Sequence, residues 1–549
     1  MKKIFPFALF PLFAMSAFAQ EGAYVDLYST KDFSTQMWGE GACYFKYQWA
    51  DEERQKSWWQ TEDGTPAIPG ADNNLWVIAD TESQTGIVSG YGIEPIEIHD
   101  LNYVLKLGSA GFTIIGAADI NMNITGNFNL TLEESYANWN PSMVNISIGG
   151  NGDTRVGNTY HVYGDMNVAN KAAWNEACQQ QGLRLTIANN YISSQIHSSS
   201  GDNTYYTTSI QQNCAFQVDG NLTFSQTPGF TSTGDLNAQR IIFQTSVTNF
   251  TVGGVVDMTP LYASTVNHEY LTEWNLKAKL GEKAETLPSD AAFDSNITIG
   301  GLKGSALLSA TEDYDAANRK INMTFTNKVD AAWQGTFRND GGTQFSLKMD
   351  SSATNAQTMI FSDKSSTNSA TGLLVDAVTV SGGTLLFQNQ STFGNGELAL
   401  DGGRFGALGD GVSFASAVLK SGALLIGNKD SFAAGIYALN LGALSKKGTE
   451  KIGIDFDGFD ASLLIGEPAY ALIFCESLSG FSDDANGDFI AQNLLGAIAN
   501  FAWDGNMLTV SFSQVPEPAA MAVLLGALAL CVATRFRRGR CRPLRWWRP

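Results

Sequence analysis

Residues 378–385 read VTVSGGTL, residues 398–405 read LALDGGRF, and residues 418–425 read VLKSGALL. These three segments lie 20 residues apart and share one pattern, in which alternating apolar residues are followed by Ser or Asp, by glycine, and by a second apolar stretch. Alternating side chains point to opposite faces of a β-strand, and glycine permits the positive φ that a tight turn requires. The pattern therefore predicts a strand–turn–strand unit that recurs at a fixed spacing.

A fixed spacing of this size predicts stacked coils, because one coil cannot cover its own apolar face until a neighbour packs on it. Period-2 alternation also occurs outside the repeat, for example in residues 120–132, 321–325 and 345–349. We therefore expect an all-β chain whose fold is a parallel β-helix, or solenoid, with a cap at each end. A β-sandwich is the main alternative, since it also consists of many short strands joined by turns.

Residues 380–385 (VSGGTL) resemble the autotransporter-associated β-strand repeat of bacterial passenger domains. The resemblance is closest over residues 340–427. It implies a right-handed parallel β-helix and a role at the cell surface or outside the cell. It implies no particular chemistry, because one fold can serve many functions.

The last 35 residues of the chain resemble the PEP-CTERM sorting signal. A Pro-Glu-Pro motif precedes an apolar run at residues 519–534, and an arginine cluster follows. The residues of the motif are Val515, Pro516, Glu517, Pro518, Arg535, Arg537 and Arg538. As a helix, residues 519–536 would span roughly 27 Å at ~1.5 Å per residue, which predicts a single C-terminal transmembrane helix. The resemblance implies processing by an exosortase-type sorting enzyme, and an anchor that is never processed is the alternative.

The N-terminus has the features of a secretory signal peptide. Two lysines precede an apolar stretch at residues 4–14, and Ala17 and Ala19 form a cleavage site before Gln20. Together the two ends predict export with signal peptidase as a partner, through an inner-membrane-anchored precursor that reaches the cell surface or the extracellular space. The expected segments are a signal peptide at 1–19, an N-terminal cap with the first coils at 20–105, β-helix repeats at 106–428, a strand-rich cap at 429–514, and the sorting signal with its transmembrane helix and basic tail at 515–549.

The chain is acidic, with 54 Asp and Glu against 34 Lys and Arg and a formal net charge of −20. Such a surface repels phosphates, so nucleic acid is not an expected partner. Hydrophobic residues make up 44% of the chain, enough to bury a core, and this excludes a largely disordered protein.

No catalytic or metal-binding motif stands out. The body contains Cys43, Cys178, Cys214 and Cys475 without a C-x-x-C pair, and their pairing as disulfides or survival as free thiols stays open. His268-Glu269 begins like a zinc-protease helix, but Thr272 occupies the position of the second histidine. We therefore expect no enzyme activity, no metal and no cofactor.

Tryptophans gather near the N-terminus, and Trp58 and Trp59 are candidate platforms for stacking a sugar. Packing at the end of the solenoid is the alternative role for such a cluster. The sequence thus predicts an exported structural or adhesin-like protein whose further partner would be an extracellular polysaccharide. The alternatives are a polysaccharide-active β-helix enzyme (a lyase or glycoside hydrolase) and a carbohydrate-binding surface protein.

Overall fold

The structure is a computed structural model in which part of the chain is described. It covers residues 24–29, 42–44, 58–79, 86–88, 96–105, 112–115, 121–133, 143–148, 159–171, 182–188, 192–197, 204–210, 215–226, 241–246, 249–259, 272–277, 295–304, 307–311, 320–326, 329–334, 336–339, 344–351, 358–362, 375–388, 391–392, 396–408, 412–426, 439–515 and 525–531. The chain divides into a first unit, Met1–Gly253 with Leu261–Leu271, and a second unit, Gly254–Pro260 with Thr272–Pro549.

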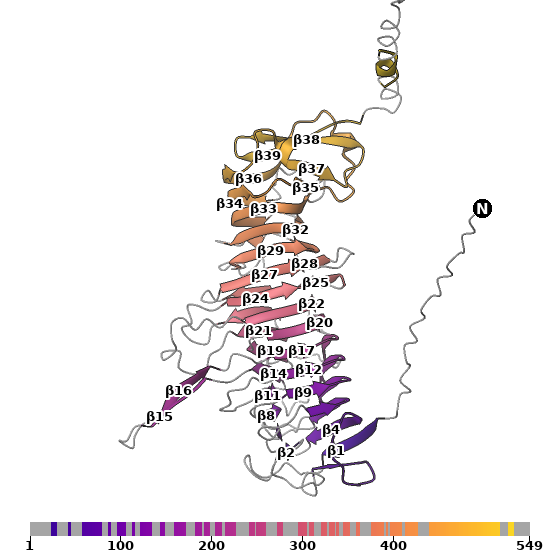
Figure 1. Cartoon of the computed structure of the whole chain (residues 1–549), viewed down its shortest axis with the longest axis vertical. Coiled ribbons are helices and arrows are strands. Elements are labelled where there is room, and N and C mark those ends of the chain that lie inside the picture. The colour runs from indigo at the N-terminus through magenta and orange to yellow at the C-terminus, as the bar shows by residue number, and fades with distance from the viewer. Residues whose placement is uncertain are drawn as a thin grey trace, which may run out of the picture. The chain divides into compact units, whose positions relative to one another are not determined.

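Three ladders of parallel strands form the first unit (Figure 1). One ladder consists of β1 (Val25–Ser29), β4 (Asn73–Ala79), β7 (Leu101–Leu105), β10 (Phe128–Leu132), β13 (Met166–Asn170) and β18 (Leu222–Gln226). Another consists of β6 (Ile96–Ile98), β9 (Asn121–Ile124), β12 (Thr159–Val162), β17 (Ala215–Val218) and the start of β20 (Asn249–Met258). The third consists of β2 (Ala42–Tyr44), β5 (Gly86–Val88), β8 (Phe112–Ile115), β11 (Met143–Ile148), β14 (Gly182–Ala188) and β19 (Ile241–Ser246).

Two short antiparallel pairings complete the first unit. β3 (Trp59–Gln60) pairs with β1, and β15 (Ile192–His197) pairs with β16 (Thr204–Ile210).

Alternation along each strand separates the core from a polar outer face. In β10, Phe128, Leu130 and Leu132 are buried, while Asn129 lies on the outer face. Asn129 donates from Nδ2 to Oδ1 of Asn102 on β7, and Asn167 on β13 donates in the same way to Asn129, each at 2.9 Å. In-register parallel pairing thus brings like residues together and satisfies their amides.

The turns between the first two ladders stack in the same register. The backbone N–H of Asn127 donates to Oδ1 of Asp100 at 2.6 Å, that of Asp165 donates to Oδ1 of Asn127 at 2.9 Å, and that of Asn221 donates to Oδ1 of Asp165 at 2.6 Å. Gly164 directly precedes Asp165, and a Cβ at Gly164 would lie 2.5 Å from the carbonyl oxygen of Gly126. The backbone of one turn therefore packs directly on that of the turn before.

The second unit is also built from parallel ladders. One contains β22 (Ser295–Gly304), β24 (Lys320–Phe325), β27 (Gln344–Asp350), β29 (Ala377–Gly382), β32 (Glu397–Leu408), β33 (Val412–Ile426), β34 (Leu439–Lys446) and β36 (Tyr470–Ser479). Another contains β25 (Ala331–Trp333), β28 (Thr358–Ser362), β30 (Thr384–Gln388), β35 (Ile452–Asp455) and β37 (Phe489–Gln492), with parts of β22, β32 and β33. β21 (Thr272–Lys277), β23 (Leu307–Thr311) and β26 (Thr336–Asn339) form a smaller ladder, and β31 (Ser391–Thr392) pairs with β33.

Two long strands join the main ladders of the second unit into a closed ring. β22 pairs with β24 through its first half and with β25 at Gly304, and β32 pairs with β29 through its first half and with β30 through its second half. The eight parallel strands β22, β24, β27, β29, β32, β30, β28 and β25 therefore close on themselves as a barrel, with further strands outside the ring. The spacing of 20 residues seen in the sequence is the register between Ala377 on β29 and Glu397 on β32.

A column of phenylalanines fills the interior of this ring and continues beyond it. Phe361, Phe387 and Phe405 lie on successive strands, with ring centroids 5.4 and 5.8 Å apart, and Phe414 follows at 5.7 Å. All four are buried. Full burial of each such side chain contributes roughly 1.5–3 kcal/mol, which makes this column a main source of stability in the second unit.

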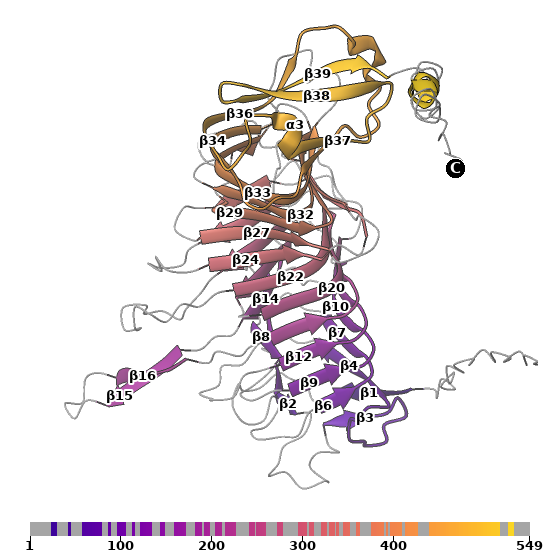
Figure 2. The ribbon, with the colours of Figure 1, turned by 45° about the horizontal axis from the view of Figure 1, so that its top comes forward.

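The C-terminal part of the second unit changes from parallel to antiparallel pairing. β39 (Met507–Gln514) pairs antiparallel with β36 and with β38 (Ala497–Asp504). The short helices η3 (Ala461–Leu464) and α3 (Ala485–Asp488) lie in the connections, and Figure 2 shows α3 beside β37 and β38. The side-chain amide of Asn486 on α3 bonds to the backbone of Phe501 on β38, accepting from its N–H at 2.9 Å and donating to its carbonyl at 3.0 Å.

A buried ion pair links β34 to α3. Lys446 Nζ donates to Oδ1 of Asp488 at 2.7 Å, and the two side chains are 5% and 7% exposed. Oδ2 of Asp488 accepts from the backbone N–H and the hydroxyl of Ser482 at 2.6 and 2.7 Å. Burial alone would raise the pKa of Asp488, but the hydrogen bonds from Lys446 and Ser482 outweigh it and hold this pKa below the ordinary 3.8.

This pKa shift predicts a loss of stability in acid. A carboxyl group whose folded pKa is lowered contributes stability that is complete above pH 3.8 and declines as the pH falls through the folded value. We expect the melting temperature of the wild type to fall below pH 3.8 more steeply than that of Asp488→Asn, measured by differential scanning fluorimetry across pH 2–6. Equal slopes for the two proteins would contradict the assignment.

The predicted fold class requires correction. The sequence predicts a right-handed parallel β-helix (solenoid) with caps, an N-terminal signal helix and a C-terminal transmembrane helix. The chain is all-β, but β22 and β32 each belong to two ladders, so the parallel pairings of the second unit close into the eight-stranded barrel described above. A strand that bends from one ladder into the next leaves no mark in a period-2 pattern, so the sequence did not show the closure.

The predicted helices are corrected as well. Across the described residues, no helix combines the length and the apolar character needed to cross a membrane. Of the span predicted at 519–536, the structure describes residues 525–531, which are helical. The prediction of a single C-terminal transmembrane helix is therefore wrong, and the structure has this short helix in its place. The inner-membrane-anchored precursor, which depended on that helix, is withdrawn with it. The signal peptide at 1–19 lies outside the described residues.

Candidate functional site

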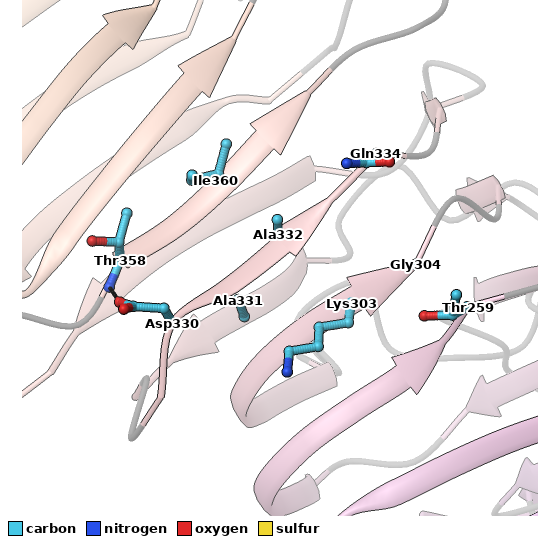
Figure 3. Close-up of a pocket in the computed structure, with 9 residues that line it drawn as sticks. All are labelled: Thr259, Lys303, Gly304, Asp330, Ala331, Ala332, Gln334, Thr358 and Ile360. Atoms are coloured by element: carbon cyan, nitrogen blue, oxygen red, sulfur yellow. Dashed lines mark hydrogen bonds between the residues drawn. The ribbon is translucent and has the colours of Figure 1, made fainter.

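A groove in the second unit is a concave site formed by described residues. Its volume is about 600 Å³, and its lining comes from the ends or outer faces of β20, β22, β25 and β28 (Figure 3). Alternation selects the lining side chains. Met359 and Phe361 of β28 are buried in the core, whereas Thr358 and Ile360, which alternate with them, are half-buried and line the groove.

The floor of the groove is made of small residues. Gly304 has φ +128°, and a Cβ there would lie 2.6 Å from the carbonyl carbon of Met258, so this close approach requires glycine. Ala332, on the neighbouring strand β25, and Ile360 add a shallow apolar surface. The floor therefore carries little side-chain bulk, which suits the apolar side of a ligand.

Polar groups surround this floor. Asp330 is exposed and accepts a hydrogen bond at Oδ1 from the backbone N–H of Thr358, at 2.8 Å, which fixes its carboxylate at the edge. Thr259 is held by Asp257, whose Oδ1 accepts from its N–H at 3.0 Å and from its hydroxyl at 2.6 Å. Gln334 lies on the far side, and its backbone N–H donates to the carbonyl of Gly304 at 2.7 Å.

Lys303 supplies the positive charge of the groove. The side chain is half-buried and extends from β22 toward the space beside Ala331 (Figure 3). Among the described residues no ion pair involves this ammonium group. An ammonium, a carboxylate, an amide and two hydroxyls around a small apolar floor can bind a polyhydroxylated ligand. Hydrolysis of a glycoside commonly uses two carboxylates, and Asp330 is the one carboxylate among the described lining residues.

The structure places few of the residues that the sequence singled out. Trp58 and Trp59 are 7% and 0% exposed. Side chains this buried pack in the interior and present no open face on which a sugar could stack. Val515 is 48% exposed, directly after β39. The other sorting residues, Pro516, Glu517, Pro518, Arg535, Arg537 and Arg538, and the cleavage residues Ala17, Ala19 and Gln20, lie outside the described residues.

The described part of the chain contains no cluster of three or more His, Cys, Asp or Glu side chains that could hold a metal ion. The acidic stretch at 483–488 has structural partners, since Asp484 caps α3 by accepting from the N–H of Asn486 at 3.0 Å and Asp488 pairs with Lys446. Cys475 is a buried free thiol whose pKa is raised by burial, and it donates to the carbonyl of Asn506 at 3.1 Å. The pairing of Cys178 and Cys214 falls outside the described residues.

Sequence reasoning missed the groove. Its polar residues come from four strands spread over residues 259–358, and no two of them form a motif along the chain. The glycines at 300, 301 and 304 around Lys303 were the available signal, because they indicate a close approach of backbones.

Comparison with known proteins identifies no relative. No family model matches the chain, and neither a curated protein nor a solved structure matches it.

Proposed function

We propose that this protein is a structural, adhesin-like component of the cell surface or extracellular matrix. The observation that supports the proposal is the in-register stacking of polar side chains on the outer face of the first unit. Asn102, Asn129 and Asn167 bond side chain to side chain, and the turns at Asp100, Asn127 and Asp165 bond in the same register. Such ladders saturate hydrogen bonds along the sheet and favour a rigid scaffold.

The C-terminal segment supports export to the cell surface or the extracellular matrix. Its resemblance to the PEP-CTERM signal implies recognition by an exosortase-type enzyme at the residues around Pro516, Glu517 and Pro518. Signal peptidase would act at Ala19 and Gln20.

Co-production with an exosortase tests this proposal. The wild type is expected to lose the residues that follow the motif, seen as a fall in intact mass, and to appear in the matrix fraction of the cells. A triple variant, Pro516→Ala, Glu517→Ala and Pro518→Ala, should keep its full mass. A wild type that keeps its tail and never leaves the cytosolic fraction would contradict the proposal.

A polysaccharide-active enzyme is the second candidate, and the groove at Lys303 and Asp330 is the observation that favours it. In eliminative cleavage of a uronate chain, a base removes the C5 proton, the C4–O bond breaks as a C4=C5 double bond forms, and an acid protonates the leaving oxygen. The groove offers the amine of Lys303 and the carboxyl group of Asp330 for these two roles. Incubation of the full chain with a panel of uronate and neutral glycans tests this candidate, with Lys303→Met and Asp330→Asn as matched variants. If the wild type forms no product from any glycan, the protein is not an enzyme of this class. If all three proteins turn over a glycan equally, the groove at Lys303 and Asp330 is not the active site.

A further inference from the structure

In the described part of the first unit, two exposed aromatic side chains lie at strand ends, Tyr24 just before β1 and Tyr163 just after β12. Tyr24 and Tyr163 are 43% and 48% exposed. Each stacks on a histidine: Tyr24 on His99 with ring centroids 3.4 Å apart, and Tyr163 on His161 with centroids 3.8 Å apart. Two phenol–imidazole stacks thus lie on the outside of the sheet, whereas Tyr160 and Phe216, on β12 and β17 of the second ladder, are buried.

Strand register fixes the spacing between the two stacks. Glu97, Asn123 and His161 are paired neighbours on β6, β9 and β12, which lie in succession in Figure 2. Two residues further on, directly after the strand ends, His99, Thr125 and Tyr163 continue this register, since the N–H of Thr125 donates to the carbonyl of Ile98 and that of Tyr163 to the carbonyl of Ile124. Strands in a sheet lie about 4.8 Å apart, so the two stacks are about 9.6 Å apart along the ladder. Alternate rings of an extended sugar chain are separated by a similar length.

Polar contacts hold both stacks in place. His161 Nε2 bonds to Oδ2 of Asp219 at 2.9 Å, and the other oxygen of Asp219 accepts from the side-chain amide of Gln217 at 2.6 Å. His99 Nδ1 bonds to Oδ1 of Asn74 at 2.9 Å. The rings are therefore preorganised, which reduces the entropy that binding would cost.

We propose that this strip, defined as Tyr24, His99, Thr125, His161, Tyr163 and Asp219, binds a linear, uncharged glycan. The rings present flat apolar faces for the C–H faces of sugars, and the amides and carboxylates beside them accept and donate hydrogen bonds to hydroxyls. The charge of the strip selects the class of glycan. Glu97, Asp100 and Asp219 lie on or beside it, and carboxylates repel a chain of uronates. This assignment does not depend on the structural role proposed above.

The strip replaces the sequence-based platform at Trp58 and Trp59. Those indoles are buried, whereas Tyr24 and Tyr163 each keep close to half of their surface exposed. Accessibility of the ring face, not the size of the ring, decides which aromatic group can stack with a ligand.

Affinity electrophoresis of the full chain tests the proposal, with soluble neutral glycans (xylan, mannan, β-glucan) and an acidic one (alginate) in the gel. We expect retardation by at least one neutral glycan and none by alginate. Tyr163→Ala combined with Tyr24→Ala should weaken binding about tenfold or more, because loss of a stacking anchor costs more than about 1.4 kcal/mol. Tyr163→Phe should bind as the wild type does, since it keeps the ring.

Phe474→Ala serves as the matched control, because Phe474 is an exposed aromatic residue of the second unit, with 37% of its surface exposed. Melting temperatures equal to that of the wild type show that each variant is folded. Failure of every neutral glycan to retard the wild type, retardation by alginate alone, or unchanged binding by the folded double tyrosine variant would each overturn the proposal.

Discussion

Replacing Phe387 with alanine is expected to lower the free energy of unfolding by about 3–5 kcal/mol. Phe387 is 1% exposed and lies between Phe361 and Phe405 in the column inside the eight-stranded ring. The substitution removes the buried ring and leaves a cavity that strands fixed on both sides cannot close. Its two aromatic neighbours also lose a partner, so the loss should lie toward the upper end of the range. Urea denaturation followed by tryptophan fluorescence measures the change.

The matched control is Leu463→Ala, which removes an apolar side chain that is 79% exposed in the same unit. Its effect should stay within about 0.5 kcal/mol, as for most surface substitutions. A Phe387→Ala protein as stable as Leu463→Ala would show that the phenylalanine column does not hold the ring together.

Arg404→Met is expected to lower the free energy of unfolding by about 3–5 kcal/mol, because it leaves a buried carboxylate without its ionic partner. Asp455 on β35 is 1% exposed, and its Oδ2 lies 2.6 Å from a terminal guanidinium nitrogen of Arg404 on β32. Asn493 donates to both carboxylate oxygens at 3.0 Å, and the N–H of Asp457 donates to Oδ1 at 2.9 Å. These neutral donors satisfy hydrogen bonds but cannot neutralise the charge.

A double-mutant cycle separates loss of the ion pair from loss of packing. Arg404→Met combined with Asp455→Asn removes the stranded charge, so the double variant should be more stable than Arg404→Met alone. Lys420→Met is the control, because Lys420 pairs with Asp401 where both side chains are close to half exposed, and exposed pairs contribute about 0–1 kcal/mol. A double variant no more stable than the single one would mean that Arg404 stabilises the fold through its packing.

The local structure of the repeat was predictable because glycine and alternation act within a few residues. Gly402 has φ +115° and Gly403 has φ +59° within β32, at the Gly-Gly pair that permits a positive φ after Asp401. The alanine-containing stretch at 489–501 contains β37 and the start of β38. There Ala497 and Phe501 are buried and Ile498 is exposed, a pattern in which strand alternation outweighed the helix propensity of its alanines.

Longer-range features were harder to predict for a physical reason. The turns TGNF, YGDM and DGNL, at residues 125–128, 163–166 and 219–222, stack in the first unit, yet they lie 38 and 56 residues apart in the chain. Insertions of unequal length conceal a register that only backbone pairing restores. The ring closure at β22 and β32 and the groove around Lys303 likewise depend on strands that meet through tertiary pairing.

The contact between Asn486 and Phe501 has a consequence for growth into filaments. In the described part of the chain β38 pairs with β39 alone, and a strand with an unpaired edge is a template on which another chain can add. The amide of Asn486 imitates one residue of such an incoming strand, since it accepts from the N–H and donates to the carbonyl of Phe501. A second molecule would have to displace this amide before it could continue the sheet, so uncontrolled polymerisation from this end is opposed by a single side chain.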